Sequence, residues 1–174
     1  TSVHGDFKEY AFDFDSNILQ ISLNAPLEVG QKISVDMQYT LKLPRTNGRY
    51  GVNAKGISLT GFYPALCAFV DGDWFFDEYS PIGDPYFCDT ANYEVTFNLP
   101  DGCEYVCSSK SKKNQEGDEI FVTSKAKNIR DFALILSSNL TKTVTNCDGV
   151  EISYLGENQK TLEYAEKAIK TYGK

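Results

Sequence analysis

Apolar and polar residues alternate along much of the chain. Leu19, Ile21 and Leu23 fall on one side of residues 17–23, and residues 31–43 continue this alternation over the longest stretch. A period of two is typical of strands that bury one face. We therefore predict one strand over all of 31–43 and about ten short strands in total. The other predicted strands are 10–14, 17–23, 93–99, 104–108, 119–124, 129–137, 142–146 and 150–155.

Turn signals separate these stretches. Asp71-Gly72-Asp73 precedes Trp74, and Asp101-Gly102 follows the predicted strand 93–99. Such Asp-Gly pairs favour tight turns. Residues 109–118 are polar and rich in lysine, so we predict them as a hairpin connection. The pattern indicates an all-β fold, a curved sandwich or saddle-like arrangement of mostly antiparallel sheets.

The C-terminal segment follows a different period. Leu162, Ala165 and Ile169 recur at helical spacing, and Gly173 is a stop signal. We predict an amphipathic helix of about four turns that begins near Asn158. The expected organisation is a β domain over 1–156 and a helical segment over 157–174.

Composition narrows the classes of partner. The chain has 174 residues, of which 41% are hydrophobic, and a formal net charge of -7. Clustered positive charge is needed to hold phosphates, so we expect no nucleic-acid partner. No apolar run of about 18 residues occurs, so we expect no membrane segment in this chain. No Lys or Arg lies between Gly56 and Ser109, which makes this acidic stretch either a solvated loop cluster, which we favour, or a face for a cationic partner.

Histidine and cysteine usage limits the chemistry. The single histidine is His4, near the start of the sequence, so no internal histidine is present for a catalytic triad or a mixed Cys/His zinc site. The chain has five cysteines, and because this number is odd, at least one is a free thiol. No C-x-x-C pair is present. We interpret them as small buried hydrophobes, with one disulfide between distant cysteines left open. They are Cys67, Cys88, Cys103, Cys107 and Cys147.

Acidic residues offer no convincing metal site. The run from Asp13 to Asn17 has the opening spacing of a calcium loop, but Ile18 stands where that loop needs glycine. The pairs Asp71/Asp73 and 77/78 are interpreted as solvated loop charge. We therefore expect no metal and no catalytic residue in this chain.

Five segments of the chain, taken in order, form a further pattern. They read GFYPAL at 61–66, DGDW at 71–74, PIGDPYF at 81–87, ANYEVT at 91–96 and IRDFA at 129–133. In this order they resemble the N-terminal β domain of gluzincin aminopeptidases, the zinc metallopeptidases related to aminopeptidase N and leukotriene hydrolase, and bacterial members above all. The resemblance runs from Leu19 to the end. The residues that carry it, which we expect to be structural, are Tyr63, Pro64, Trp74, Gly83, Asp84, Tyr93, Arg130, Asp131 and Phe132.

The resemblance implies a supporting role. In that family the zinc ligands, H-E-x-x-H and a downstream glutamate, lie in the next domain, and this chain contains no such motif. The chain would be a fragment without its first strands, not an enzyme and without a cofactor of its own, that caps and supports the absent zinc-bearing catalytic domain. Some members contribute a Gln or Glu from this domain to the substrate pocket. Residues 56–64 contain neither, so no substrate-binding residue is assigned.

The resemblance and the strand pattern also predict partners for this chain. The catalytic domain of the same parent chain is the expected partner, and exposed strand edges predict a homo-oligomer. The alternative is a free-standing exported β-sandwich that binds carbohydrate or protein through its acidic, aromatic middle. In that case Trp74 and residues 75–76 would form a contact patch, although we favour a core or sheet-flanking role. A hydrolase with paired carboxylates has the least support. The cellular compartment is left open.

Overall fold

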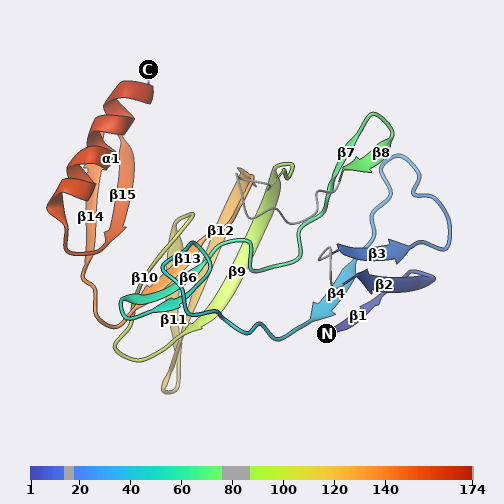
Figure 1. The fold of residues 1–174 in the computed structure, drawn as a ribbon, viewed down its shortest axis with the longest axis horizontal. Helices are drawn as coiled ribbons and strands as arrows, with labels where there is room; N and C mark the ends of the chain where they lie inside the picture. Colours follow the sequence, from blue (N-terminus) through green and yellow to red (C-terminus); the bar gives the residue numbers. More distant parts are fainter. Residues whose placement is uncertain (14–17, 76–86, 174) are drawn as a thin grey trace. The chain divides into compact units, whose positions relative to one another are not determined.

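The computed structural model describes residues 1–13, 18–75 and 87–173 (Figure 1). This part of the chain contains fifteen strands and one C-terminal helix, and the strand pairings are antiparallel except for one isolated bridge. The prediction of an all-β fold with a single terminal helix is confirmed. The chain divides into two compact units, Thr1–Lys42 with Ala65–Asp89, and Leu43–Pro64 with Thr90–Lys174. One β domain over 1–156 stays a prediction.

The first unit consists of three two-stranded sheets. They pair β1 (Ser2–Gly5) with β4 (Val35–Gln38), β2 (Glu9–Asp13) with β3 (Ile18–Ser22), and β7 (Ala68–Val70) with β8 (Asp73–Phe75). Two central turn residues join β7 to β8, and both have positive φ, 53° at Asp71 and 88° at Gly72. Such angles are those of the tight two-residue hairpin that the Asp-Gly signal predicted.

The prediction of one long strand over 31–43 is wrong. Only Val35–Gln38 forms a strand, because its partner β1 has four residues and pairs with it one for one. The alternation survives within this strand, where Val35 and Met37 are half-buried. Tyr39 and Leu41 are exposed. Side-chain alternation thus predicted the faces of the strand, whereas its length depends on a backbone partner that periodicity does not reveal.

The second unit contains two larger sheets. One has the order β10 (Glu104–Cys107), β13 (Leu134–Ser137), β6 (Gly56–Leu59), β5 (Gly51–Asn53); the other has the order β11 (Ser111–Glu116), β12 (Glu119–Ile129), β9 (Ala91–Leu99). The buried core draws side chains from both sheets, so the sheets pack against each other. These core residues are Leu99, Tyr105, Val122, Phe132 and Leu134.

The polar segment 109–118 was predicted as a connection and is largely a strand. Its residues Ser111–Glu116 pair with β12, from Ser111 opposite Ser124 to Glu116 opposite Glu119. β11 is an edge strand of its sheet, and most of its residues are exposed. Lysines on an edge strand discourage pairing with other chains, so polarity here marks an edge and not a loop.

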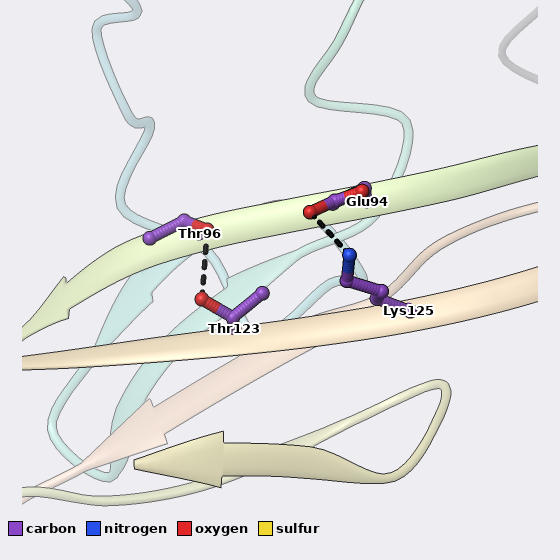
Figure 2. A network of polar contacts seen from close by, with 4 residues as sticks. All are labelled: Glu94, Thr96, Thr123 and Lys125. Carbon is purple, nitrogen blue, oxygen red and sulfur yellow. Dashed lines mark hydrogen bonds and ion pairs between the residues drawn. The ribbon is translucent and has the colours of Figure 1, made fainter. Parts of the chain in front are cut away.

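The exposed face of the β9–β12 ladder is held by two cross-strand pairs (Figure 2). The carboxylate of Glu94 lies 2.7 Å from the ammonium of Lys125, and the hydroxyls of Thr96 and Thr123 are 2.9 Å apart. Both pairs are directly opposite in the ladder. Such pairs each contribute about 0.2–1 kcal/mol to a sheet. At least one carboxylate of the acidic stretch therefore has a structural partner.

The chain ends in a hairpin and the helix, which lie together in Figure 1. β14 (Lys142–Cys147) pairs with β15 (Val150–Leu155), and α1 spans Gln159–Tyr172. The side chain of Asn158 caps the helix by accepting the Lys160 N–H at 3.1 Å, and Leu162 is buried. The predicted start and end of the helix are confirmed. No helix of the described chain is long and apolar enough to cross a membrane.

Candidate functional site

Most of the described residues that carry the family resemblance meet in one place. Tyr63 lies in the loop after β6 and Tyr93 lies on β9. The other three, Arg130, Asp131 and Phe132, form the turn that leads from β12 toward β13. We call these five residues the Tyr63 cluster. Its members come from three distant parts of the sequence, and direct contacts join them.

The hydroxyl of Tyr63 is the centre of this cluster. It accepts the backbone N–H of Phe132 at 2.7 Å and donates to the Oδ1 of Asp131, also at 2.7 Å. The hydroxyl of Tyr93 donates to the carbonyl of Arg130 at 3.3 Å. Two tyrosines thus supply hydrogen bonds that the turn between β12 and β13 does not obtain from a sheet ladder.

Aromatic contacts pack the cluster into the core. The rings of Tyr63 and Tyr93 are 5.2 Å apart between centroids and meet edge to face, and Tyr93 lies 6.1 Å from Phe132. Phe132 is fully buried. Edge-to-face pairs contribute about 0.5–1.5 kcal/mol beyond the area they bury. The ring of Tyr63 is therefore held against Tyr93, which in turn packs on the buried Phe132.

The environment of Tyr63 keeps its hydroxyl neutral. Burial raises the pKa of this hydroxyl well above its ordinary value of 10.0, and the hydrogen bond that it donates to Asp131 adds to the shift. A neutral hydroxyl can donate one hydrogen bond and accept others, which is the use that the geometry shows. A tyrosine that serves as a nucleophile or base needs the opposite shift. The Tyr63 hydroxyl is therefore suited to structural hydrogen bonding, and the structural role expected for Arg130 and Asp131 stays a prediction.

The remaining predicted residues do not join the Tyr63 cluster. Pro64 is exposed and is the last residue of its segment before the chain enters the first unit. Gly83 and Asp84 lie outside the described residues. Trp74 lies on β8 in the first unit and packs edge to face on Phe69, with ring centroids 5.0 Å apart.

The β7–β8 hairpin shows a group of exposed apolar side chains. Trp74 is 49% exposed and Phe69 is 57% exposed, so these rings flank the hairpin and are not core residues. The predicted core or sheet-flanking role therefore fits Trp74 in its sheet-flanking form, and residue 76 lies outside the described residues. Five large apolar side chains are exposed on this hairpin or just before it. They are Leu66, Phe69, Val70, Trp74 and Phe75.

The five cysteines are all thiols in the structure. Cys147 is buried beneath α1, where its thiol donates to the Glu166 carbonyl at 3.6 Å. The Cys107 thiol donates to the Ser109 carbonyl at 3.2 Å. Within the described ranges, no three His, Cys, Asp or Glu side chains are grouped so that they could hold a metal ion.

Comparisons of the chain with protein families, with curated proteins and with solved structures find no match. The resemblance to the gluzincin β domain therefore depends on the segments named above.

One group of side chains that meet in the structure was not predicted from the sequence. Lys142 on β14 places its ammonium 4.5 Å from the ring centroid of Tyr105 on β10, and Lys113 on β11 lies 5.4 Å from the same centroid. The sequence predicted a strand over 142–146 and a connection over 109–118, but it gave no partner for either. Only the pairing of the sheets brings these lysines to one ring.

Replacing Tyr63 by Phe tests the anchor. The variant leaves the Phe132 N–H without its acceptor, so we expect the free energy of unfolding at pH 7 to fall by about 1–3 kcal/mol. The raised pKa of Tyr63 stabilises the native protein fully below about pH 10, and this contribution is lost as the pH rises further, because the unfolded tyrosine ionises first. Urea unfolding from pH 7 to pH 11 should show a steeper alkaline loss in the wild type.

Tyr93→Phe is the matched control. Its longer bond reaches a carbonyl of an exposed residue, so its loss should cost less than the loss of the Tyr63 hydroxyl. Equal stability of wild type and Tyr63→Phe, with parallel alkaline slopes, would show that the hydroxyl anchors nothing.

Proposed function

We propose that this chain is a non-catalytic β domain of an aminopeptidase-like zinc metallopeptidase of the gluzincin type. Its role is to cap and support the catalytic domain of the same parent chain. The zinc and its ligands belong to that domain. This chain itself is then not an enzyme and needs no cofactor.

The observation that carries this proposal is the Tyr63 cluster. Tyr63, Tyr93 and the 130–132 turn were selected because three separate segments resemble the family, and no contact between them was known from the sequence. Hydrogen bonds and ring contacts join all three segments. A shared structural role for these positions supports the view that the segments belong to one ancestral domain.

The outer face of α1 supports a partner on that side. Leu162 packs inward against the β14–β15 hairpin, whereas Tyr164 is 70% exposed and Tyr172 is 84% exposed. These tyrosines are two helical turns apart, so they lie on the same side of the helix, with the exposed Ala168 between them. Tyrosine is enriched at protein interfaces, so this face suits docking against the catalytic domain.

The reading frame that encodes the chain tests this proposal. We expect it to continue beyond Lys174 into a segment that contains H-E-x-x-H and a downstream glutamate. The purified chain, supplied with zinc and an aminoacyl p-nitroanilide, should release no p-nitroaniline above the zinc-only rate, because zinc-activated water requires protein ligands. The protein encoded by the whole frame, assayed alongside as the control, should release it.

Two results would contradict the proposal. One is zinc-dependent turnover by the purified chain; the other is a frame without the zinc motif. The alternative, a binding module, is favoured by the exposed aromatic side chains of the β7–β8 hairpin beside Asp71 and Asp73. A frame without the motif, together with a saturable glycan or protein ligand whose binding Trp74→Ala abolishes, would establish that alternative.

We further propose that two copies of the chain associate through the free edge of β9. This nine-residue strand pairs with β12 on one side and with no other strand of the described chain. β11, at the other edge of the sheet, presents Lys112 and Lys113, whereas Glu94 is the only charged residue of β9. An edge with few charges is the better template for strand addition.

Sedimentation velocity over a concentration series tests this association. We expect a dimer to form as the concentration rises, since backbone hydrogen bonds along β9 drive it. Asn98→Lys and Thr96→Lys add edge charges and should shift the distribution toward monomer, whereas Thr143→Lys at an exposed position of β14 should not. A monomer at every concentration would contradict the proposal.

A further inference from the structure

The second unit contains a small polar cleft that the proposed function does not use. It lies between the segment 105–111, which leads from β10 to β11, and the β14–β15 hairpin, and its volume is about 250 Å³. We call it the Lys142 cleft. The residues with charged or serine side chains that line it are Ser109, Lys110, Ser111, Lys142, Glu151 and Ser153.

The register of the hairpin explains which side chains face this cleft. Val144 lies opposite Ser153, and both line the cleft, as does Lys142 two residues earlier on the same face. Cys147 lies on the other face and is buried against α1. The helix therefore covers one face of the hairpin, and the other face forms a wall of the cleft.

Lys142 is the central group of the cleft. Its side chain is half-buried, and its ammonium lies 4.5 Å from the ring centroid of Tyr105, which holds it in position. Among the described residues it forms no ion pair with a carboxylate. A second ammonium, that of Lys113, lies 5.4 Å from the same ring. A half-buried cation with a like charge nearby gains from an anion that approaches it.

Hydroxyl groups supply further donors. The hydroxyls of Tyr105 and Ser111 are 2.8 Å apart, and either can donate to the other. Only one of their two protons is used in that bond. Because Tyr105 is almost fully buried, the remaining proton is best placed on Ser111, which lines the cleft. The cleft therefore offers a hydroxyl donor beside the ammonium groups.

A buried serine fixes the loop that carries these donors. Ser124 is fully buried, and its hydroxyl lies 3.2 Å from the Lys110 carbonyl and 3.4 Å from the Ser109 carbonyl, to either of which it can donate. The hydroxyl of Ser109 donates to the Lys125 carbonyl at 2.9 Å. These bonds use the Ser109 hydroxyl proton and two backbone acceptors of the loop, so the Lys110 ammonium and the Ser111 hydroxyl are the side-chain donors of this loop left for a ligand.

We propose that the Lys142 cleft binds a phosphate group. Two lysines, Lys110 and Lys142, and the hydroxyls of Ser111 and Ser153 match the acceptor oxygens of a phosphate, and the volume admits a group of that size. The carboxylate of Glu151 lines the cleft as well and opposes an anion, so it limits the affinity. This proposal does not depend on the proposed function of the chain.

Nuclear magnetic resonance with the ¹⁵N-labelled chain tests the site. We expect inorganic phosphate to shift the amide signals of residues 109–111 and 142 in a saturable way, with a dissociation constant on the order of 1 mM. Potassium chloride at matched ionic strength should leave them unchanged. Glycerol 3-phosphate is titrated in a parallel experiment. Tighter binding of this ester would identify a phosphate monoester as the ligand, and tighter binding of inorganic phosphate would identify the free ion.

Variants distinguish phosphate binding in the cleft from general electrostatic attraction to lysines. Lys142→Gln should weaken phosphate binding about tenfold or more. Lys142→Arg should retain binding, and Glu151→Gln should strengthen it. Lys127→Gln, which removes an exposed lysine of β12 that does not line the cleft, is the matched control and should bind like the wild type. The dispersion of each spectrum shows whether the variant is folded.

Three results would overturn the proposal. The first is a set of shifts that potassium chloride reproduces, and the second is the absence of binding to both phosphate compounds. The third is a folded Lys142→Gln variant that binds phosphate like the wild type.

Discussion

The second unit depends on one hydrogen-bonding centre, the hydroxyl of Tyr63. It joins the loop after β6 to the turn between β12 and β13, 69 residues further along the chain at Phe132. The Phe132 side chain is fully buried between the sheets, so the turn that carries it must pass close to the core. A backbone N–H in such a position requires an acceptor, and an unsatisfied one costs about 1–3 kcal/mol.

The same interaction explains the packing around it. Because Tyr63 must keep its hydroxyl near Phe132, its ring is brought against Tyr93 on β9, which then reaches the Arg130 carbonyl. A strand of one sheet, a loop from the other and the turn that connects the sheets are thereby tied together. The cluster explains how three segments far apart in the sequence serve one structural purpose.

Local features of the fold could be predicted from the sequence. The Asp71–Gly72 turn, the strand 150–155 and the capped helix after Asn158 depend on nearby residues, and all are confirmed. The length of β4 and the strand character of 111–116 depend on distant partners, so periodicity and polarity gave the wrong answer for them.

In the candidate sites, too, residue types could be predicted from the sequence, whereas contacts between distant segments could not. The residues of the Tyr63 cluster could be selected from the sequence, but their contacts could not, because three segments far apart must meet. Lys142 and Tyr105 had no signal at all, since a lysine beside an aromatic ring depends only on the packing of β14 against β10.

Native-state hydrogen exchange at the Phe132 amide tests the central claim most directly. If the Tyr63 hydroxyl is the acceptor that the core requires, this amide exchanges with an opening free energy near that of global unfolding. In Tyr63→Phe it then exchanges through a local opening, while the amide of Val122 in the core follows the global stability. A Phe132 amide that exchanges in the wild type as fast as an exposed loop amide would contradict the account.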